Sequence, residues 1–231
     1  MYKNKIPPKL QNLFDKIENC PFCARKKNPY KHILGGGKFQ KPKFFFIFIN
    51  PTHLNISAHQ NYEGKLRFPF IGVKYFWRFL SEVGLFSNDL VRKLYQGGWK
   101  IEYENLIETE LVKNSLYLTN LVKCTKNNPS PPSKEEIQRG LIFLKKEISI
   151  VDPKYIVTFG ILPFYALTGK KVLLKEVERL SIENDIPFFS PIKIDGKSYK
   201  IFPCYFPVGR GNPKKSASLL KRIIKFGLIN N

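Results

Sequence analysis

The apolar residues of this chain gather into four short continuous runs. They cover residues 44–50, 116–122, 155–159 and 200–205, and each is bounded by turn-forming or polar residues. A short run in which nearly every position is apolar is typical of a β-strand that is covered on both faces. The pattern therefore predicts four buried strands.

The segments between these runs carry apolar residues at helical spacing. Ser133 and Glu136 have the spacing of a capping box, which predicts that a helix begins there. Further helices are predicted over residues 9–19, 73–83, 163–167 and 214–226, and residues 88–107 are ambiguous. Strands that alternate with helices predict an α/β fold, a three-layer α/β/α domain with a central, mostly parallel four-stranded sheet in chain order. With 231 residues the chain fits one such domain, spanning 1–231.

Polar residues follow the strands where the strands end. Asn50 ends the first run, Asn120 lies in the second, and the loop 206–213 follows the fourth. Parallel sheets bind ligands at the carboxyl ends of their strands. We therefore expect these residues to share one rim.

The charge balance indicates the class of partner. The chain has 39 Lys and Arg against 18 Asp and Glu, a formal net charge of +21. Such an excess favours a polyanion, and a nucleic acid in particular, as the partner. The alternative is a Lys-rich solvated surface of the kind that thermophile proteins often have.

Four cysteines in a chain of this length do not form the disulfide framework of a secreted protein. The first residues lack the apolar core of a signal peptide, and the longest apolar run is too short to span a membrane. We therefore expect a soluble cytoplasmic protein with no membrane partner. In a reducing compartment, the Cys20-x-x-Cys23 pair indicates metal or cluster ligation, or a redox pair.

Six fragments, taken in order, resemble a known family. They are Cys20–Cys23, Ile49–Pro51, Phe68–Gly72, Thr119–Cys124, Val151–Gly160 and Ile201–Pro207. Their order and spacing resemble the uracil-DNA glycosylase superfamily, most closely its iron–sulfur branch, family 4. The resemblance implies an enzyme that hydrolyses the N-glycosidic bond of uracil or a related deaminated base in DNA. The alternative is a non-catalytic DNA-binding protein with the same fold, such as a subunit of a repair or replication assembly. The sequence does not indicate a particular protein partner.

The resemblance assigns roles to three residues. Phe70 would stack on the flipped base, and Asn120 would read its edge through an amide that both donates and accepts. Asn50 would place the attacking water, as in the Asn-Pro loop of other branches. The alternatives are structural: Phe70 would be a core residue, Asn120 would cap a strand end, and Asn50 would belong to a turn.

Two catalytic positions depart from the family pattern. The iron–sulfur branch has Glu where this chain has Ile49, and most members have His where alignment of the last strand places Phe206. Phe206 can stack but cannot donate a hydrogen bond. A second register would place Asn212 at that position, and His53 is an alternative donor.

The resemblance also implies a 4Fe–4S cluster. Cys20, Cys23 and Cys124 match three of its four cysteine ligands, and the fourth position is Gly140. Cys204, the remaining cysteine, is either a ligand or a buried core thiol. A zinc ion, or no metal, also remains open.

Basic residues around the last loop are candidates for phosphate contact. Arg210, Asn212, Lys214 and Lys215 precede or open the C-terminal helix. Side chains at a loop and backbone N–H groups at a helix start both suit phosphate oxygens. We expect DNA to contact the protein there.

Overall fold

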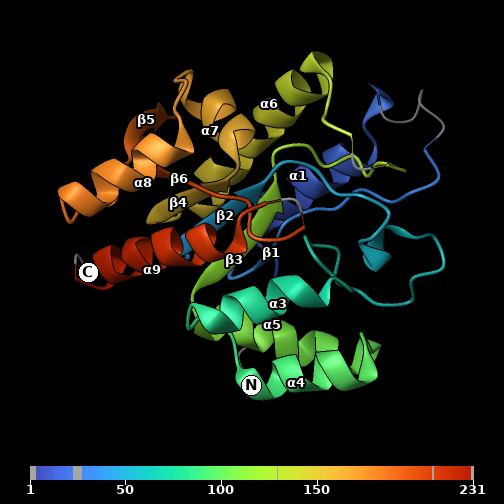
Figure 1. Cartoon of the computed structure of the whole chain (residues 1–231). Coiled ribbons are helices and arrows are strands. Elements are labelled where there is room, and N and C mark those ends of the chain that lie inside the picture. The colour runs from blue at the N-terminus through green and yellow to red at the C-terminus, as the bar shows by residue number, and fades with distance from the viewer. Residues whose placement is uncertain (1–3, 23–27, 129, 210, 230–231) are drawn as a thin grey trace.

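A six-stranded sheet forms the centre of the computed structural model, which describes residues 4–22, 28–128, 130–209 and 211–229 (Figure 1). Its strands are β1 Gly36–Gly37, β2 Phe44–Phe48, β3 Leu116–Asn120, β4 Tyr155–Phe159, β5 Ser190–Ile194 and β6 Lys197–Cys204. Their order is β1-β3-β2-β4-β6-β5. The four inner strands are parallel, and β1 and β5 pair antiparallel at the edges.

The four predicted strands form the inner sheet, but two features of the prediction are wrong. The sheet has six strands rather than four, because β1 is a glycine pair and β5 exposes much of its length, so neither gives an apolar run. The strands also do not follow chain order, since β2 lies between β3 and β4. Helical crossovers can place the next parallel strand on either side, which an apolar pattern does not specify. The order makes the carboxyl end of β2 a topological switch point.

Helices cover both faces of the sheet, which confirms the three-layer α/β/α architecture (Figure 1). One face carries α1 Pro8–Glu18, α6 Lys134–Val151 and α7 Ile161–Thr168. The other carries α3 Lys74–Glu82, α4 Asn88–Gly97, α5 Glu104–Lys113, α8 Leu174–Glu183 and α9 Pro213–Ile229. Short 3₁₀ turns lie at Ile56–Ala58 (η1) and Ile101–Tyr103 (η2). The predicted capping box opens α6, while the sequence pattern did not predict α8.

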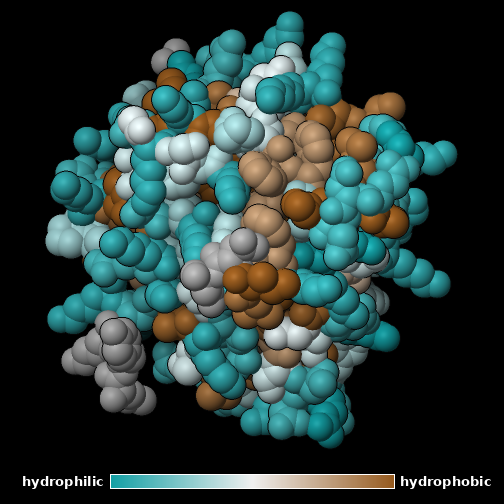
Figure 2. All heavy atoms as spheres, turned by 90° about the vertical axis from the view of Figure 1, so that its left-hand side faces the viewer, coloured by the Kyte–Doolittle hydropathy of each residue, from teal (hydrophilic) through white to brown (hydrophobic). Residues whose placement is uncertain are grey.

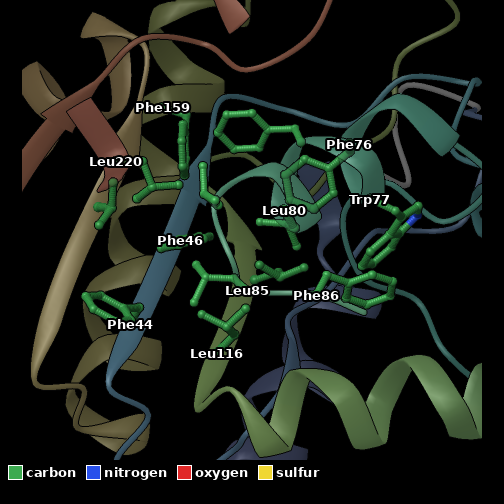
Figure 3. Close-up of a cluster of buried hydrophobic side chains, with 14 of the residues drawn as sticks. Phe44, Phe46, Phe76, Trp77, Leu80, Leu85, Phe86, Leu116, Phe159 and Leu220 are labelled. Carbon is green, nitrogen blue, oxygen red and sulfur yellow. The ribbon is translucent and has the colours of Figure 1, made fainter. Parts of the chain in front are cut away.

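Side chains alternate between the two faces along each inner strand. Phe44, Phe46 and Phe48 of β2 pack toward α3 and α9, while Phe45 and Ile47 pack toward α1 and α6. Figure 3 shows the first of these cores, in which aromatic rings from the sheet meet those of α3. Each buried phenylalanine contributes about 1.5–3 kcal/mol through the apolar surface that it removes from water. The alternation also determines the face on which each site residue emerges.

The outer surface is mostly hydrophilic on the side of β5, α8 and α9 (Figure 2). Exposed apolar side chains occur at both ends of α8, in the segment after it and at the end of α9: Leu173, Ile182, Ile186, Leu228 and Ile229. In the described part of the chain, no helix combines the length and the apolar composition that a membrane crossing needs.

Candidate functional site

Parallel pairing brings the carboxyl ends of β2 and β3 side by side. Phe48 and Asn120 are the last paired residues of the two strands. Beyond them the N–H of Leu121 donates to the carbonyl oxygen of Phe48 (2.7 Å), and the N–H of Val122 donates to that of Ile49 (3.0 Å). The loop that carries Asn50 therefore lies directly beside Asn120 at the rim of the sheet.

The side chain of Asn120 is buried with an unused donor. The residue is 2% exposed, and its Nδ2 atom has no hydrogen-bond partner among the residues that the structure describes. A buried donor without a partner costs about 1–3 kcal/mol, and such atoms are rare in native proteins. Asn120 shares the sheet face of Leu116 and Leu118, which is the face of Phe48. The amide is thus ready to donate to a group that enters on this face.

Four aromatic rings, which we call the aromatic box, surround this face of the strand ends: Phe48, Phe70, Phe76 and Phe206. Phe70 stacks on Phe76 with ring centroids 4.0 Å apart, and the Phe48 ring meets Phe70 nearly at right angles at 4.6 Å. The Phe206 centroid lies 6.4 Å from both Phe48 and Phe70. Phe70 and Phe206 are only half-buried, so the box has an accessible side.

The backbone of Phe70 is strained. Its φ angle is +70°, which bulky residues rarely adopt and which typically costs about 1–3 kcal/mol. Its carbonyl oxygen accepts hydrogen bonds from the N–H of Val73 (2.9 Å) and from Nε1 of Trp77 (3.2 Å). These contacts hold the ring in the box. Strain of this kind is often found at binding sites.

The loop after β6 brings Phe206 to the box and leaves Asn212 elsewhere. The N–H of Asn212 donates to the Phe206 carbonyl oxygen (3.1 Å), and a Cβ atom at Gly211 would lie 2.1 Å from that oxygen, so only glycine fits there. Asn212 itself caps α9, where its Oδ1 accepts from the N–H of Lys215 (3.1 Å). The structure thus places a phenyl ring, rather than an amide, next to Phe70.

Asn50 and His53 lie in the loop that follows β2. The Asn50 amide is half-buried and donates to the neighbouring Pro51 carbonyl oxygen (3.2 Å). The His53 N–H donates to the Lys126 carbonyl oxygen (2.9 Å), and Thr52 forms a bridge with Lys126. The Nδ1 atom of His53 is buried and has no hydrogen-bond partner in the described part of the chain. The loop is therefore braced against the segment after β3, with one orphaned ring nitrogen.

Two of the predicted ligand cysteines meet in one pocket on the other face. Cys20 and Cys124 line it together with His32 and Gly140, the fourth predicted cluster position. Cys124 is disulfide-bonded and Cys20 is a buried free thiol. A Cβ atom at Gly140 would lie 2.3 Å from the Leu121 carbonyl oxygen, so α6 packs here too closely for a side chain. Cys23 lies outside the described residues.

The described residues alone do not form a complete metal site. Within that part of the chain, no three His, Cys, Asp or Glu side chains gather closely enough to hold an ion. The Cys20 thiol, and the Cys124 thiol that reduction would release, nevertheless have the donor chemistry that iron–sulfur clusters and zinc use. His32, which the sequence reasoning passed over, adds a nitrogen donor, and burial lowers its pKa.

Cys204 is not brought to this pocket. It lies on the opposite face of the sheet, in the core with Phe202, and its thiol contacts the Ser216 carbonyl oxygen at 3.6 Å. Burial raises the pKa of this thiol to about 12. Cys204 is therefore a protonated core thiol, which is one of the two alternatives that the sequence left open.

The basic residues near the last loop differ in exposure and in whether they form ion pairs. Lys215 forms an ion pair with Glu178 (2.6 Å between Nζ and Oε2), and its ammonium lies over the Tyr205 ring. Lys214 is exposed and forms no ion pair with any residue that the structure describes. Arg210 lies outside the described residues. Lys214 is thus the more accessible of the two lysines for phosphate.

Phe48, which the sequence places in a buried strand, forms a wall of the aromatic box. Sequence reasoning missed two further buried residues of this region. Lys123 and Glu147 form a buried ion pair behind Asn120. A lysine in an apolar run and a glutamate on the apolar face of α6 are the signals that could have revealed the pair.

The sequence that forms this fold matches a known family. A profile of the uracil DNA glycosylase superfamily matches residues 36–226, and the chain belongs to this superfamily. It is similar to two proteins, each named a Type-4 uracil-DNA glycosylase. The one from Sulfurisphaera tokodaii is 31% identical over 106 residues, 42% of each chain. The one from Pyrobaculum aerophilum is 33% identical over 158 residues, 68% of this chain and 64% of the relative. The chain thus covers less than two thirds of either relative's length.

Proposed function

We propose that this protein is a DNA glycosylase that removes uracil, or a related deaminated base, from DNA. The observation that carries the proposal is the buried, unpartnered Nδ2 of Asn120, which lies beside an aromatic box at the topological switch point. The relatives named as uracil-DNA glycosylases support the same conclusion.

Base recognition follows from the chemistry of this site. A base that has left the stack would lie against Phe70, and stacking on an aromatic ring contributes about 1–3 kcal/mol. The Asn120 Nδ2 would donate to O4 of uracil, and its Oδ1 would accept from N3–H. Cytosine has a donor at the 4-position and an acceptor at N3, so a fixed amide in this orientation rejects it.

The bond to be broken joins N1 of the base to C1′ of the sugar. Its electron pair leaves with the base, the sugar becomes cationic, and water adds at C1′ while its proton is lost to solvent. Asn50 would orient this water after its amide turns away from the Pro51 carbonyl oxygen. The orphaned ring nitrogen of His53 is the second candidate group in the same loop.

Excision should be slow, because two stabilising groups are absent. Ile49 cannot activate water, and Phe206 cannot donate to the negative charge that develops on the base. Losing one such donor typically costs about 100- to 1000-fold in rate. The remaining stabilisation of the transition state would come from the DNA phosphates and from the Asn120 contact.

DNA is the proposed partner, and the charge of +21 supports it. Lys214 would contact phosphate directly, with Arg210 nearby in sequence. Asn212 would act by capping α9, and Lys215 would first have to leave Glu178.

A metal or a 4Fe–4S cluster is proposed for the cysteine pocket. Cys20, Cys23 and reduced Cys124 would supply three thiolates, and the fourth ligand would be something other than residue 140, which is glycine. Bound there, the group would clamp the N-terminal segment to the end of β3 and take no part in bond cleavage. Iron and zinc analysis of anaerobically purified protein tests this. Metal should be lost in Cys20→Ser and kept in Cys204→Ala, and equal metal content in both variants would contradict the assignment.

The proposed function is tested by single-turnover excision. Enzyme in excess is mixed with single- and double-stranded oligonucleotides that carry one uracil, and with matched thymine and cytosine controls. We expect slow release of uracil alone. The competing function is a non-catalytic DNA-binding protein, which Ile49 and Phe206 favour. Tight binding with no release of any base over hours would establish that alternative.

A further inference from the structure

A buried polar network lies directly behind Asn120, on the other face of β3. Glu147 of α6 is fully buried and forms an ion pair with Lys123, at 2.5 Å between Oε2 and Nζ. The Thr119 hydroxyl donates to Glu147 Oε1 (3.0 Å), and Lys123 also donates to the Thr119 oxygen. Tyr117 donates to the same Glu147 oxygen (2.7 Å). One carboxylate of α6 therefore holds three residues of the β3 segment.

This network acts where β3 has little other support. Strand β1 pairs with Tyr117 and Leu118 and ends there, so at Thr119 and Asn120 the strand has a strand partner only on its β2 side in the part of the chain that the structure describes. Thr119 faces α6 while Asn120 faces the aromatic box, because neighbouring strand residues point to opposite faces. Glu147 thus fixes the backbone of this stretch from behind the amide.

Stability alone does not explain the ion pair. A buried pair often contributes no more than apolar residues of the same size would, because both charges lose their water. Here desolvation lowers the pKa of Lys123, which reflects the same cost. The backbone at Gly35 also has to come close, since a Cβ atom there would lie 2.3 Å from Glu147 Oε1. The ion pair and the close approach of Gly35 fix the relative positions of these groups more specifically than apolar packing would.

We propose that Thr119, Lys123 and Glu147 are positioning residues that hold the Asn120 amide in the orientation that distinguishes uracil from cytosine. The inference rests on the proposed function, since it concerns the reading of the base. These residues do not touch the base. They determine where the Nδ2 donor points, because the Thr119 side chain and the Asn120 backbone move together.

The test separates positioning from simple loss of stability. Binding is measured to oligonucleotides that carry 2′-fluoro-2′-deoxyuridine or 2′-fluoro-2′-deoxycytidine, which resist cleavage. The readout is the ratio of the two affinities. Thr119→Val removes the hydroxyl, and Thr119→Ser keeps it. Thr158→Val is the matched control, because Thr158 is equally buried in β4 and its hydroxyl bonds to the Phe202 carbonyl oxygen instead.

We expect Thr119→Val to lower the preference for uracil about tenfold, which is the effect of roughly one misplaced hydrogen bond. Thr119→Ser and Thr158→Val should keep the wild-type ratio. If Thr119→Val does not fold, the double variant Lys123→Met/Glu147→Gln removes both charges together and should lose the preference in the same assay.

Two results would overturn the inference. One is an unchanged ratio in Thr119→Val, or in the double variant, while wild-type protein prefers uracil. The other is an equal loss in Thr119→Val and Thr158→Val, which would indicate a general structural effect. Wild-type protein that binds both oligonucleotides equally would instead refute base reading itself, and the positioning role with it.

Discussion

At the scale of single residues, unsatisfied and strained groups mark the site. Asn120 keeps a buried donor without a partner, and Phe70 adopts a φ of +70°. The strained backbone and the unpaired buried donor each cost free energy. They lie on one face of the sheet, which supports a single binding pocket.

Asn120→Asp tests base reading. At pH 8 a carboxylate can only accept hydrogen bonds, so it should repel O4 of uracil and accept from the amino group of cytosine. We expect the affinity preference between the two 2′-fluoro oligonucleotides to reverse. If the Asn120→Asp variant still prefers uracil as strongly as wild type does, Asn120 does not contact the base.

Phe206→His tests the missing donor. An imidazole at this position would stabilise the charge on the leaving base, and we expect single-turnover excision to rise by up to about 100-fold. Phe206→Leu is the control, because it opens the box without adding a donor. A rise of the same size in both variants would indicate access rather than charge stabilisation.

Residue-level prediction from the sequence has a physical limit. Motif spacing predicted which side chains belong to the site, because the carboxyl ends of parallel strands meet at one rim. It could not give the direction of the Asn50 amide, which depends on a contact with Pro51 in its own loop. Nor could it show that Cys204 lies on the opposite face from Cys20, since that depends on where β6 begins its alternation.

At the scale of elements, continuous apolar runs identified the inner strands, and periodicity identified most helices. The sheet order was missed, because crossover helices do not encode the side on which the next strand is added. The pairing of Thr119 with Glu147 was also missed, since it joins β3 to α6 across 28 residues. Long-range contacts of this kind leave no local pattern.

Helices α8 and α9 are joined by a charge pair that should depend on pH. Hydrogen bonding from Lys215 lowers the pKa of the Glu178 carboxyl below its usual value. The pair therefore stabilises the folded protein above the unfolded-state pKa of about 4.3, and this contribution is lost as pH falls through the lowered folded-state value.

Urea unfolding of Glu178→Gln and wild type measures this effect. At pH 7 we expect the variant to be less stable by about 0.2–1 kcal/mol, the usual range for a partly exposed pair. The difference should shrink toward zero in acid. A difference that stays constant from pH 7 down to acid would contradict an electrostatic origin.

At the scale of the whole molecule, a chain with a net charge of +21 carries a site that is largely aromatic. Charge gives affinity for the DNA backbone without regard to sequence, whereas the box and Asn120 would select the base. These two contributions can be separated by salt, since phosphate contacts weaken as salt rises and stacking does not.

Lys214→Gln tests the phosphate contact. Each contact contributes about −0.9 to the slope of log K against log salt on duplex DNA. We expect this variant to lower the slope by about one contact. Lys9→Gln on α1 is the matched control, because it removes an equal charge on the opposite helical layer. Equal slopes in the two variants would exclude a local contact at Lys214.

The most direct measurement is a crystal structure of the protein with single-stranded DNA that carries 2′-fluoro-2′-deoxyuridine. The account predicts a uracil that has left the base stack and lies on Phe70, with Asn120 Nδ2 donating to its O4 at about 2.9 Å. The account would be contradicted if DNA bound at Lys214 while the uracil lay outside the aromatic box and Asn120 Nδ2 stayed unpartnered.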